Sequence, residues 1–249
     1  MSSVELELEI ASPNSLRLET AVVGTKTIDV AYAPFDFVNS EARIAIVGMT
    51  PGRQQMANAL REAHRLLLTG ASIEAAAKAA KTFASFSGPM RNNLVEMLDH
   101  VGVAKMFGLA TTSTLWGRDV RMVHFTSALR YPVFVAGENY SGSPDILRTP
   151  LLTAQLRKWF AAEMASLQHA IFVPLGPKVG AALLSVAQEI GVNPNRILAG
   201  LPHPSGASAE RIAYFMGRKS RSALSAKTNP AILDAAKSRL LQQIQKLQQ

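Results

Sequence analysis

Two short segments of the sequence combine residue types that could bind and act on a planar ligand. The first is GMTPG, residues 48–52, whose glycines let the backbone approach a flat ligand closely while Pro51 stiffens the turn. The second is HPSG, residues 203–206, in which prolines on both sides fix the backbone of His203. An imidazole held in this way can donate a hydrogen bond to developing negative charge. We therefore expect the two segments to contribute to one site.

Each segment follows an apolar run that is typical of a buried strand. Residues 43–47 (RIAIV) end in GMTPG, and residues 196–201 (RILAGL) run into HPSG, after which Ser208 is placed to cap a helix. In an open parallel sheet, ligands bind beyond the carboxyl ends of the strands, because loops gather there and helix N-termini expose unpaired N–H groups. Both segments are expected at such positions.

Strand and helix patterns alternate through the middle of the chain. Apolar residues recur at helical spacing between residues 89 and 101, and the Ala-rich stretch 72–82 is interpreted as a surface cover. This alternation predicts an α/β fold with a parallel sheet. Further strands are expected at 120–126 and 170–175, and helices at 54–69, 72–82, 89–101, 151–167 and 178–190.

Both ends of the chain are expected to decorate one main domain. Residues 1–40 contain three stretches of alternating polarity, which predict an N-terminal β extension packed on that domain. Residues 41–217 are expected to form the α/β domain itself. Residues 218–249 then comprise a basic segment and an amphipathic helix from Ala231, which packs on the domain or on a second copy of the chain in a homo-oligomer. The alternating stretches are 4–10, 16–22 and 27–32.

Composition narrows the class of protein. The chain has 249 residues, of which 48% are apolar, and no apolar run nears the roughly 18 residues that cross a bilayer, so a cytoplasmic protein without membrane contact is expected. Cysteine is absent, which excludes disulfides, iron–sulfur clusters and cysteine-rich zinc sites. The 26 Lys and Arg against 18 Asp and Glu favour polyanionic partners such as nucleic acid. No metal or cofactor is expected, since the remaining histidines, His64, His100, His124 and His169, lack ligand spacing.

The order and separation of strand–GMTPG and strand–LPHPSGAS resemble the two signature motifs of the uracil-DNA glycosylase superfamily. Between them, residues 123–132 (VHFTSALRYP) are similar to the strand whose polar residue recognises the base, and residues 171–176 (IFVPLG) resemble the strand and turn before the last helix. The likeness spans roughly residues 43–217 and, without cysteine, points to the cluster-free branches. It implies a three-layer α/β/α sandwich around a central parallel sheet. It also implies an enzyme that flips a base out of DNA and hydrolyses its N-glycosidic bond.

The resemblance also implies roles for individual residues. His203 would stabilise the departing base anion, Phe86 would stack on the base, and Ser127 would read its edge at a position where asparagine is usual. The backbone of the first motif would line the base, through Gly48, Met49, Pro51 and Gly52. The second motif would press into the duplex and a basic cluster would meet the DNA backbone, through Pro204, Ser205, Gly206, Ala207, Ser208, Arg218, Lys219 and Arg221.

The first motif departs from the family at the position that handles water. The family usually has an acid or asparagine there, whereas this chain has Thr50, which cannot act as a general base at neutral pH but can orient water through its hydroxyl or carbonyl. Nearby acids that could take over are Asp36, Glu138 and Asp145, of which Glu138 is the preferred choice.

Each assignment has a plainer alternative. GMTPG and His203 can be ordinary turn residues, Phe86 a core residue, Ser127 a satisfied buried hydroxyl, and residues 218–221 a solvated face. At the level of function, the alternatives are a non-catalytic module of the same fold that binds nucleic acid or nucleotide, and a protein acting on a small phosphorylated ligand. The sequence lacks the P-loop and GxGxxG patterns that would favour the last.

Overall fold

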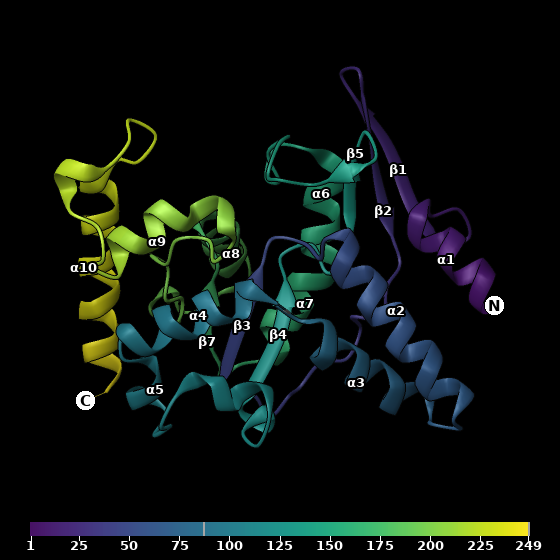
Figure 1. Ribbon diagram of the computed structural model, residues 1–249, viewed down its shortest axis with the longest axis horizontal. Coiled ribbons are helices and arrows are strands. Elements are labelled where there is room, and N and C mark those ends of the chain that lie inside the picture. The colour runs from purple at the N-terminus through teal and green to yellow at the C-terminus, as the bar shows by residue number, and fades with distance from the viewer. Residues whose placement is uncertain (87, 249) are drawn as a thin grey trace. The chain divides into compact units, whose positions relative to one another are not determined.

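A computed structural model describes residues 1–86 and 88–248 of the chain (Figure 1). By their internal packing these residues form two compact units, each assembled from several stretches of sequence. Unit 1 comprises residues 1–40, 48–85 and 125–166, and unit 2 comprises the described parts of 41–47, 86–124 and 167–249.

Unit 1 contains an antiparallel sheet with the strand order β1-β2-β5-β6. Two of the stretches predicted as strands, 16–22 and 27–32, are confirmed as the hairpin of β1 and β2. The hairpin of β5 and β6 was not predicted, and β5 pairs with β2 so that Val133 lies opposite Val30. The strands are β1 (Arg17–Val23), β2 (Lys26–Ala31), β5 (Val133–Val135) and β6 (Glu138–Asn139).

The prediction of a strand at residues 4–10 is wrong, because this stretch forms helix α1 (Ser3–Ala11). A capping box starts the helix: the Ser2 hydroxyl accepts from the Glu5 N–H at 3.2 Å, and the Glu5 carboxylate accepts from the Ser2 N–H at 2.7 Å. Leu6 and Ile10 lie four residues apart and are buried together, as one helical face requires.

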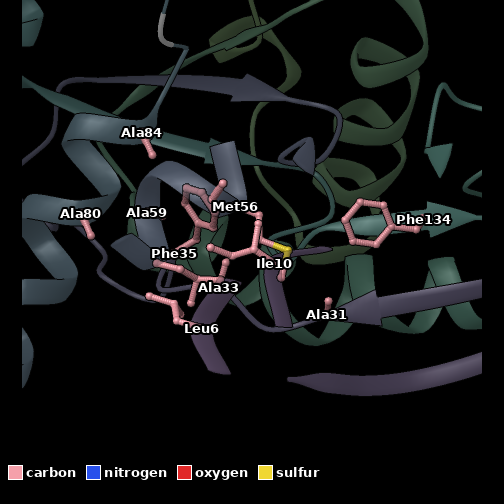
Figure 2. Packing of buried hydrophobic residues seen from close by; sticks show 12 residues of the cluster. Leu6, Ile10, Ala31, Ala33, Phe35, Met56, Ala59, Ala80, Ala84 and Phe134 are labelled. Carbon is pink, nitrogen blue, oxygen red and sulfur yellow. The ribbon is translucent and has the colours of Figure 1, made fainter. Parts of the chain in front are cut away.

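The apolar core of unit 1 is formed largely by helices α1, α2 and α3 together with the loop after β2. Figure 2 shows the ring of Phe35 and the side chain of Met56 packed among Leu6, Ile10 and small alanines. The predicted helices at 54–69, 72–82 and 151–167 are confirmed, the last one with a π-helical turn at Leu156–Ala161. The helices are α2 (Arg53–Leu68), α3 (Ile73–Ala84), α6 (Pro150–Gln155) and α7 (Ala162–Ser166).

The chain also forms the predicted parallel sheet, which has three strands in the order β4-β3-β7. In β3 (Ile44–Gly48) every residue is buried, and β3 pairs in parallel with β7 (Ile171–Pro174). The strand predicted at 120–126 is β4 (Val123–Ser127), preceded by a single 3₁₀ turn. This sheet makes the chain an α/β protein, as predicted.

The last predicted strand, residues 196–201, is not formed. Among the described residues, this run makes one isolated bridge to the sheet, between Ile197 and Phe172 of β7. The Leu198 N–H donates to the Phe172 carbonyl at 2.8 Å, but the next N–H, of Ala199, turns back to the Ile197 carbonyl at 2.9 Å. The run therefore leaves the sheet after one bond, although it still leads directly into HPSG.

The helices predicted in unit 2 are confirmed, and the short helix α5 was not predicted. Ser208 is the N-cap of α9 as expected, but its side chain makes no capping bond. The terminal helix packs on unit 2 itself, where it contacts α9 and α5 and buries Leu240 and Ile244. No helix among the described residues is long and apolar enough to cross a membrane. The helices are α4 (Pro89–His100), α5 (Val103–Met106), α8 (Pro177–Ile190), α9 (Ala209–Phe215) and α10 (Pro230–Leu247).

Gly200 lets α10 approach the chain just before HPSG. Its φ is +145°, and a Cβ there would lie 2.8 Å from the Ala236 carbonyl oxygen and 3.2 Å from the Leu240 Cβ. We expect Gly200→Ala to lower the free energy of unfolding by about 1–3 kcal/mol, because backbone must move to relieve the overlap. Urea denaturation measures the change, with Gly206→Ala as the control, since a Cβ at Gly206 meets nothing within 4 Å. Equal effects of the two substitutions would contradict the close approach.

Candidate functional site

The GMTPG segment, residues 48–52 of unit 1, begins at the last residue of β3 and leads into α2. The carbonyls of Gly48 and Met49 accept hydrogen bonds from the backbone N–H groups of Ala128 and Leu129, each at 2.9 Å. The segment therefore lies against the stretch that follows β4. This is the arrangement expected of loops that leave neighbouring parallel strands at their carboxyl ends.

The hydroxyl of Thr50 is already committed within this arrangement. It donates to the Tyr131 carbonyl at 2.9 Å and accepts from the Val133 N–H at 3.1 Å. A hydroxyl has one proton and two lone pairs, so only one acceptor position remains. Thr50 thus fixes the turn against residues 131–133, and its side chain cannot donate a hydrogen bond to water without breaking this link.

Arg53 and Asn139 support the end of the GMTPG segment, and sequence reasoning did not single them out. The Arg53 N–H, at the start of α2, donates to the Asn139 Oδ1 at 2.8 Å. The guanidinium stacks 4.3 Å from the centre of the Phe134 ring. Its partners lie far away in the sequence, so no local pattern reveals them. It also donates to three backbone carbonyls, those of Ile10, Ala11 and Gly137.

Glu138, the acid preferred from the sequence, is exposed and follows a tight turn between β5 and β6. Ala136 and Gly137 have φ values of +51° and +79°, as a two-residue type I′ hairpin turn requires. Among the described residues, no hydrogen bond holds the Glu138 carboxylate. Asp145 is also exposed, and its Oδ1 accepts from the Leu147 N–H at 2.9 Å. Neither carboxylate is fixed by contacts with the GMTPG segment.

Ser127 and Phe86, the two residues expected to contact a base, are both buried. Ser127 is the last residue of β4, directly before the stretch that pairs with GMTPG. Phe86 belongs to unit 2, is only 6% exposed and has a φ of +50°, a conformation that costs a non-glycine residue about 1–3 kcal/mol. The burial of the Phe86 ring favours the alternative of a core residue.

His203 lies in unit 2 and carries a defined tautomer. The Ser205 N–H donates to the His203 Nδ1 at 3.2 Å, and the Ser205 hydroxyl lies 2.9 Å from the same nitrogen. Since a backbone N–H can only donate, Nδ1 must be the acceptor, and the neutral ring then carries its proton on Nε2. Burial lowers the pKa of His203, which further favours the neutral ring. Within the described residues, no hydrogen bond occupies Nε2.

The HPSG loop is held by two residues that the sequence did not reveal. The Asn93 side chain of α4 donates to the Pro204 carbonyl at 2.8 Å. Gly176, with a φ of +95°, lies so close that a Cβ there would be 3.5 Å from the Cβ of His203. Asn93 and Gly176 therefore fix the backbone beside the imidazole within unit 2.

The basic cluster after α9 is partly paired with acids. Arg218 lies 3.0 Å from Glu96, and Lys219 lies 2.8 Å from Glu210. The Glu210 carboxylate also accepts from the hydroxyls of Thr228 and Ser225. The hydrogen bond from Lys219, and after it those from Thr228 and Ser225, hold the pKa of Glu210 well below its usual range. The side chains of Arg218 and Glu96 are 53% and 48% exposed, and an exposed ion pair is worth about 0.2–1 kcal/mol, so a phosphate can displace this pair. Arg221 is exposed.

A group of charged and polar side chains is buried in unit 1, and only Asp36 among them drew attention in the sequence. Glu163, which is 2% exposed, accepts from the Thr126 hydroxyl at 2.6 Å and from the Arg130 Nε at 2.5 Å. Arg130 also stacks on Trp159 of the π-helical turn, with 4.8 Å between the guanidinium carbon and the ring centre. We call this group the buried polar cluster; its members are Asp36, Lys81, Thr126, Arg130, Tyr131 and Glu163.

Lys81 shows that α3 is more than the surface cover expected from its alanines. It is 3% exposed, and its ammonium donates to the Phe37 carbonyl at 2.6 Å. Burial lowers the pKa of Lys81 to about 8, against the opposing effect of the Glu163 and Asp36 charges. A lysine inside the unit can therefore lose its proton in mildly alkaline solution.

This lysine should make stability depend on pH. Between about pH 8 and 10.5 the unfolded chain keeps the Lys81 proton and the folded chain does not, so this group's contribution to stability increases as pH rises. Between these two pH values, the free energy of unfolding of the wild type should increase by about 3 kcal/mol relative to that of Lys81→Met. Urea denaturation of both proteins from pH 7.5 to 10 measures most of this increase. Lys78→Met, at an exposed position on α3, is the control that should show no such trend.

The other histidines show no arrangement for a metal ion. The Nε2 of His64 lies 3.1 Å from the Met1 carbonyl, and the Nε2 of His100 lies 2.8 Å from the Lys237 ammonium. Over residues 1–86 and 88–248, no group of three or more His, Asp or Glu side chains is placed to hold a metal ion.

Comparison with known proteins identifies one relative over most of the chain. No family model matches the sequence, and no solved structure matches it. The chain is 34% identical over 212 residues to the uncharacterized protein YoxB of Bacillus subtilis (strain 168). The match covers 84% of this chain and 83% of YoxB. The chain therefore belongs to the same protein family as YoxB of Bacillus subtilis.

Proposed function

We propose that this protein is a DNA base-excision enzyme of the uracil-DNA glycosylase type, with that superfamily's three-layer α/β/α arrangement around the parallel sheet. It flips uracil or a related damaged base out of DNA and hydrolyses the N-glycosidic bond. The proposal rests on the ordered motifs and on the local structure of each. GMTPG leaves β3 through a glycine, and HPSG follows the stretch that touches β7.

The neutral tautomer of His203 is the observation that carries the proposal. When the glycosidic bond breaks, the base departs with both electrons and becomes an anion. A preset donor stabilises such charge as it develops, without reorganisation during the reaction. With Nδ1 occupied by the Ser205 N–H, the Nε2–H of His203 is the donor available to the base.

The GMTPG segment would supply a rigid backbone for the base. Its bonds to Ala128 and Leu129 place it beside Ser127, whose hydroxyl would read the base edge. Gly48 and Gly52 keep side chains away from the ring. Asn139 and Arg53 then fix the exit of the segment into α2.

Contacts with DNA would come from the second motif and the basic cluster of unit 2. Residues 206–208 form a single 3₁₀ turn after Ser205, a compact shape for insertion against a duplex. Arg218, Lys219 and Arg221 would contact phosphates, and the formal charge of +8 favours binding to a polyanion. Affinity should therefore fall steeply as salt is raised.

One observation favours the alternative of a binding module that does not cleave. Thr50 stands at the position where the glycosylase superfamily has the residue that positions or activates water. Its hydroxyl donates its proton to the Tyr131 carbonyl instead. A protein that holds an extruded base without hydrolysing it would need no water-handling group there.

Uracil-containing oligonucleotides separate these functions. Single- and double-stranded forms are incubated with excess protein at low salt, next to matched oligonucleotides that carry thymine. Alkali-labile sites at uracil alone support the enzyme. Tight, uracil-dependent binding without such sites supports the binding module. If no protein concentration gives either cleavage at uracil or uracil-dependent binding, the enzyme and the binding module are both rejected.

A further inference from the structure

The proposed reaction needs a group that accepts a proton from water, and the first motif does not provide it. When water attacks the sugar cation, the new C–O bond leaves a proton that must pass to a base. Thr50 cannot serve, since its hydroxyl is not basic and is already bonded on two sides. The acceptor must therefore come from another element near the GMTPG segment.

We infer that Asp36 is this general base. The inference rests on the proposed function and assigns a residue to its hydrolytic step. Tyr131 carries the argument, because it bonds both partners within unit 1: its carbonyl accepts from Thr50, and its phenol donates to the Asp36 carboxylate. One residue thus links Asp36 directly to the first motif, which the described contacts of Glu138 and Asp145 do not.

Asp36 is oriented by phenols and is half-buried. Besides Tyr131, the hydroxyl of Tyr32 also bonds to the Asp36 carboxylate, and the two rings lie 5.7 Å apart. Burial and the Asp36 charge raise the pKa of Tyr32 to about 12, and the pKa of Tyr131 is raised by the same causes. Both phenols therefore remain donors at neutral pH. Since a carboxylate has about four acceptor positions, bonds from two phenols leave room for a water molecule.

The charges around Asp36 belong to the buried polar cluster. Lys81 approaches from α3, Arg130 precedes Tyr131, and Glu163 of α7 pairs with Arg130. The Lys81 ammonium and the Asp36 carboxylate interact through their charges. The carboxylate is thus oriented by phenols and lies near the Lys81 cation, and because Asp36 is only half-buried, water can reach it.

The proposed hydrolysis has two steps, release of the base and attack by water. The C–N bond breaks, its electron pair leaves with the base, and the Nε2–H of His203 stabilises the anion. The water oxygen bonds to the sugar carbon, and one water proton passes to the Asp36 carboxylate, which later releases it to solvent. The released base anion takes up a proton from solvent, so that one water molecule in total is added across the C–N bond.

Asp36→Asn tests this role in a single-turnover assay on whichever uracil oligonucleotide the wild type cleaves. We expect base release to slow about a hundredfold or more, and the acid limb of the pH–rate profile to disappear, because the amide cannot accept the proton. Asp29→Asn, on β2, is the matched control and should stay within about twofold of the wild type. A merely structural role would lower the rate but leave the shape of the profile unchanged.

The other outcomes are equally decisive. If Asp36→Asn fails to fold, Asp36→Glu keeps the charge, and the inference requires it to be slow while retaining the acid limb. If the Asp36 variants cleave at the wild-type rate, or if Glu138→Gln removes the acid limb instead, the inference is wrong and the proposed function stands. If the wild type itself makes no alkali-labile site, the proposed enzyme fails and the inference fails with it.

Discussion

Replacing His203 with alanine is expected to slow base release about a hundred- to a thousandfold, the usual cost of removing one preset donor to a developing anion. The alanine variant loses the two contacts between the imidazole and Ser205, but it keeps the Asn93 bond to the Pro204 carbonyl, which still anchors the loop. Binding of uracil-containing DNA should therefore change much less than the rate. Single-turnover rates and binding titrations on the same oligonucleotide measure the two effects separately.

One control variant and the pH dependence of the wild type test this expectation further. His64→Ala removes a histidine of unit 1 whose ring bonds to the Met1 carbonyl, outside both motifs, and its rate should match the wild type. The rate of the wild type should not rise as pH falls from about 8 to 6.5, since the pKa of His203 is lowered and the neutral ring is the working form. A rate that increases on protonation, or an unchanged rate in His203→Ala, would contradict the role given to the imidazole.

Elements with one consistent local pattern were predicted correctly from the sequence. RIAIV is apolar at nearly every position, as a strand buried on both faces must be, and it forms β3. Residues 4–10 were misread because Leu6 and Ile10 satisfy both a strand period and a helix face. The Ser2 and Glu5 capping box was the local signal that decides for a helix. RILAGL was misread because its turn at Ala199 and the close approach of α10 are set by tertiary packing.

In the candidate site, too, contacts between neighbouring residues could be predicted from the sequence and contacts between distant residues could not. The bond between His203 and Ser205 joins residues two apart, so the HPSG motif alone could indicate a fixed imidazole. Thr50 and Asp36 instead find Tyr131 at separations of 81 and 95 residues. No pattern in a single sequence shows such pairs. The sequence therefore preferred Glu138 over Asp36 without any information on the contacts that hold either carboxylate.

Replacing Glu163 with glutamine is expected to lower the free energy of unfolding by about 3–5 kcal/mol, because it leaves the charge of Arg130 buried and uncompensated. The side chains of Arg130 and Glu163 are 10% and 1% exposed, and both carboxylate oxygens carry hydrogen bonds, from Arg130 and Thr126. An amide in place of the carboxylate turns one of these acceptors into a donor that faces another donor. Urea denaturation of the full chain measures the loss.

Glu62→Gln is the matched control for this loss. Glu62 accepts from the Arg65 Nε and Nη2 at 2.9 and 2.7 Å, so it too is paired with both of these guanidinium nitrogens, but the Arg65 side chain is 60% exposed. The two nitrogens bond separate oxygens of Glu62, whereas both Arg130 nitrogens approach Oε1 of Glu163. Water can solvate Arg65 when its partner is lost, so the control should cost less than about 1 kcal/mol. Adding Arg130→Met to Glu163→Gln removes the stranded charge and should recover part of the stability. Equal losses for Glu163→Gln and Glu62→Gln would show that burial does not set the strength of the pair. No recovery on adding Arg130→Met would show that the loss came from packing and not from charge.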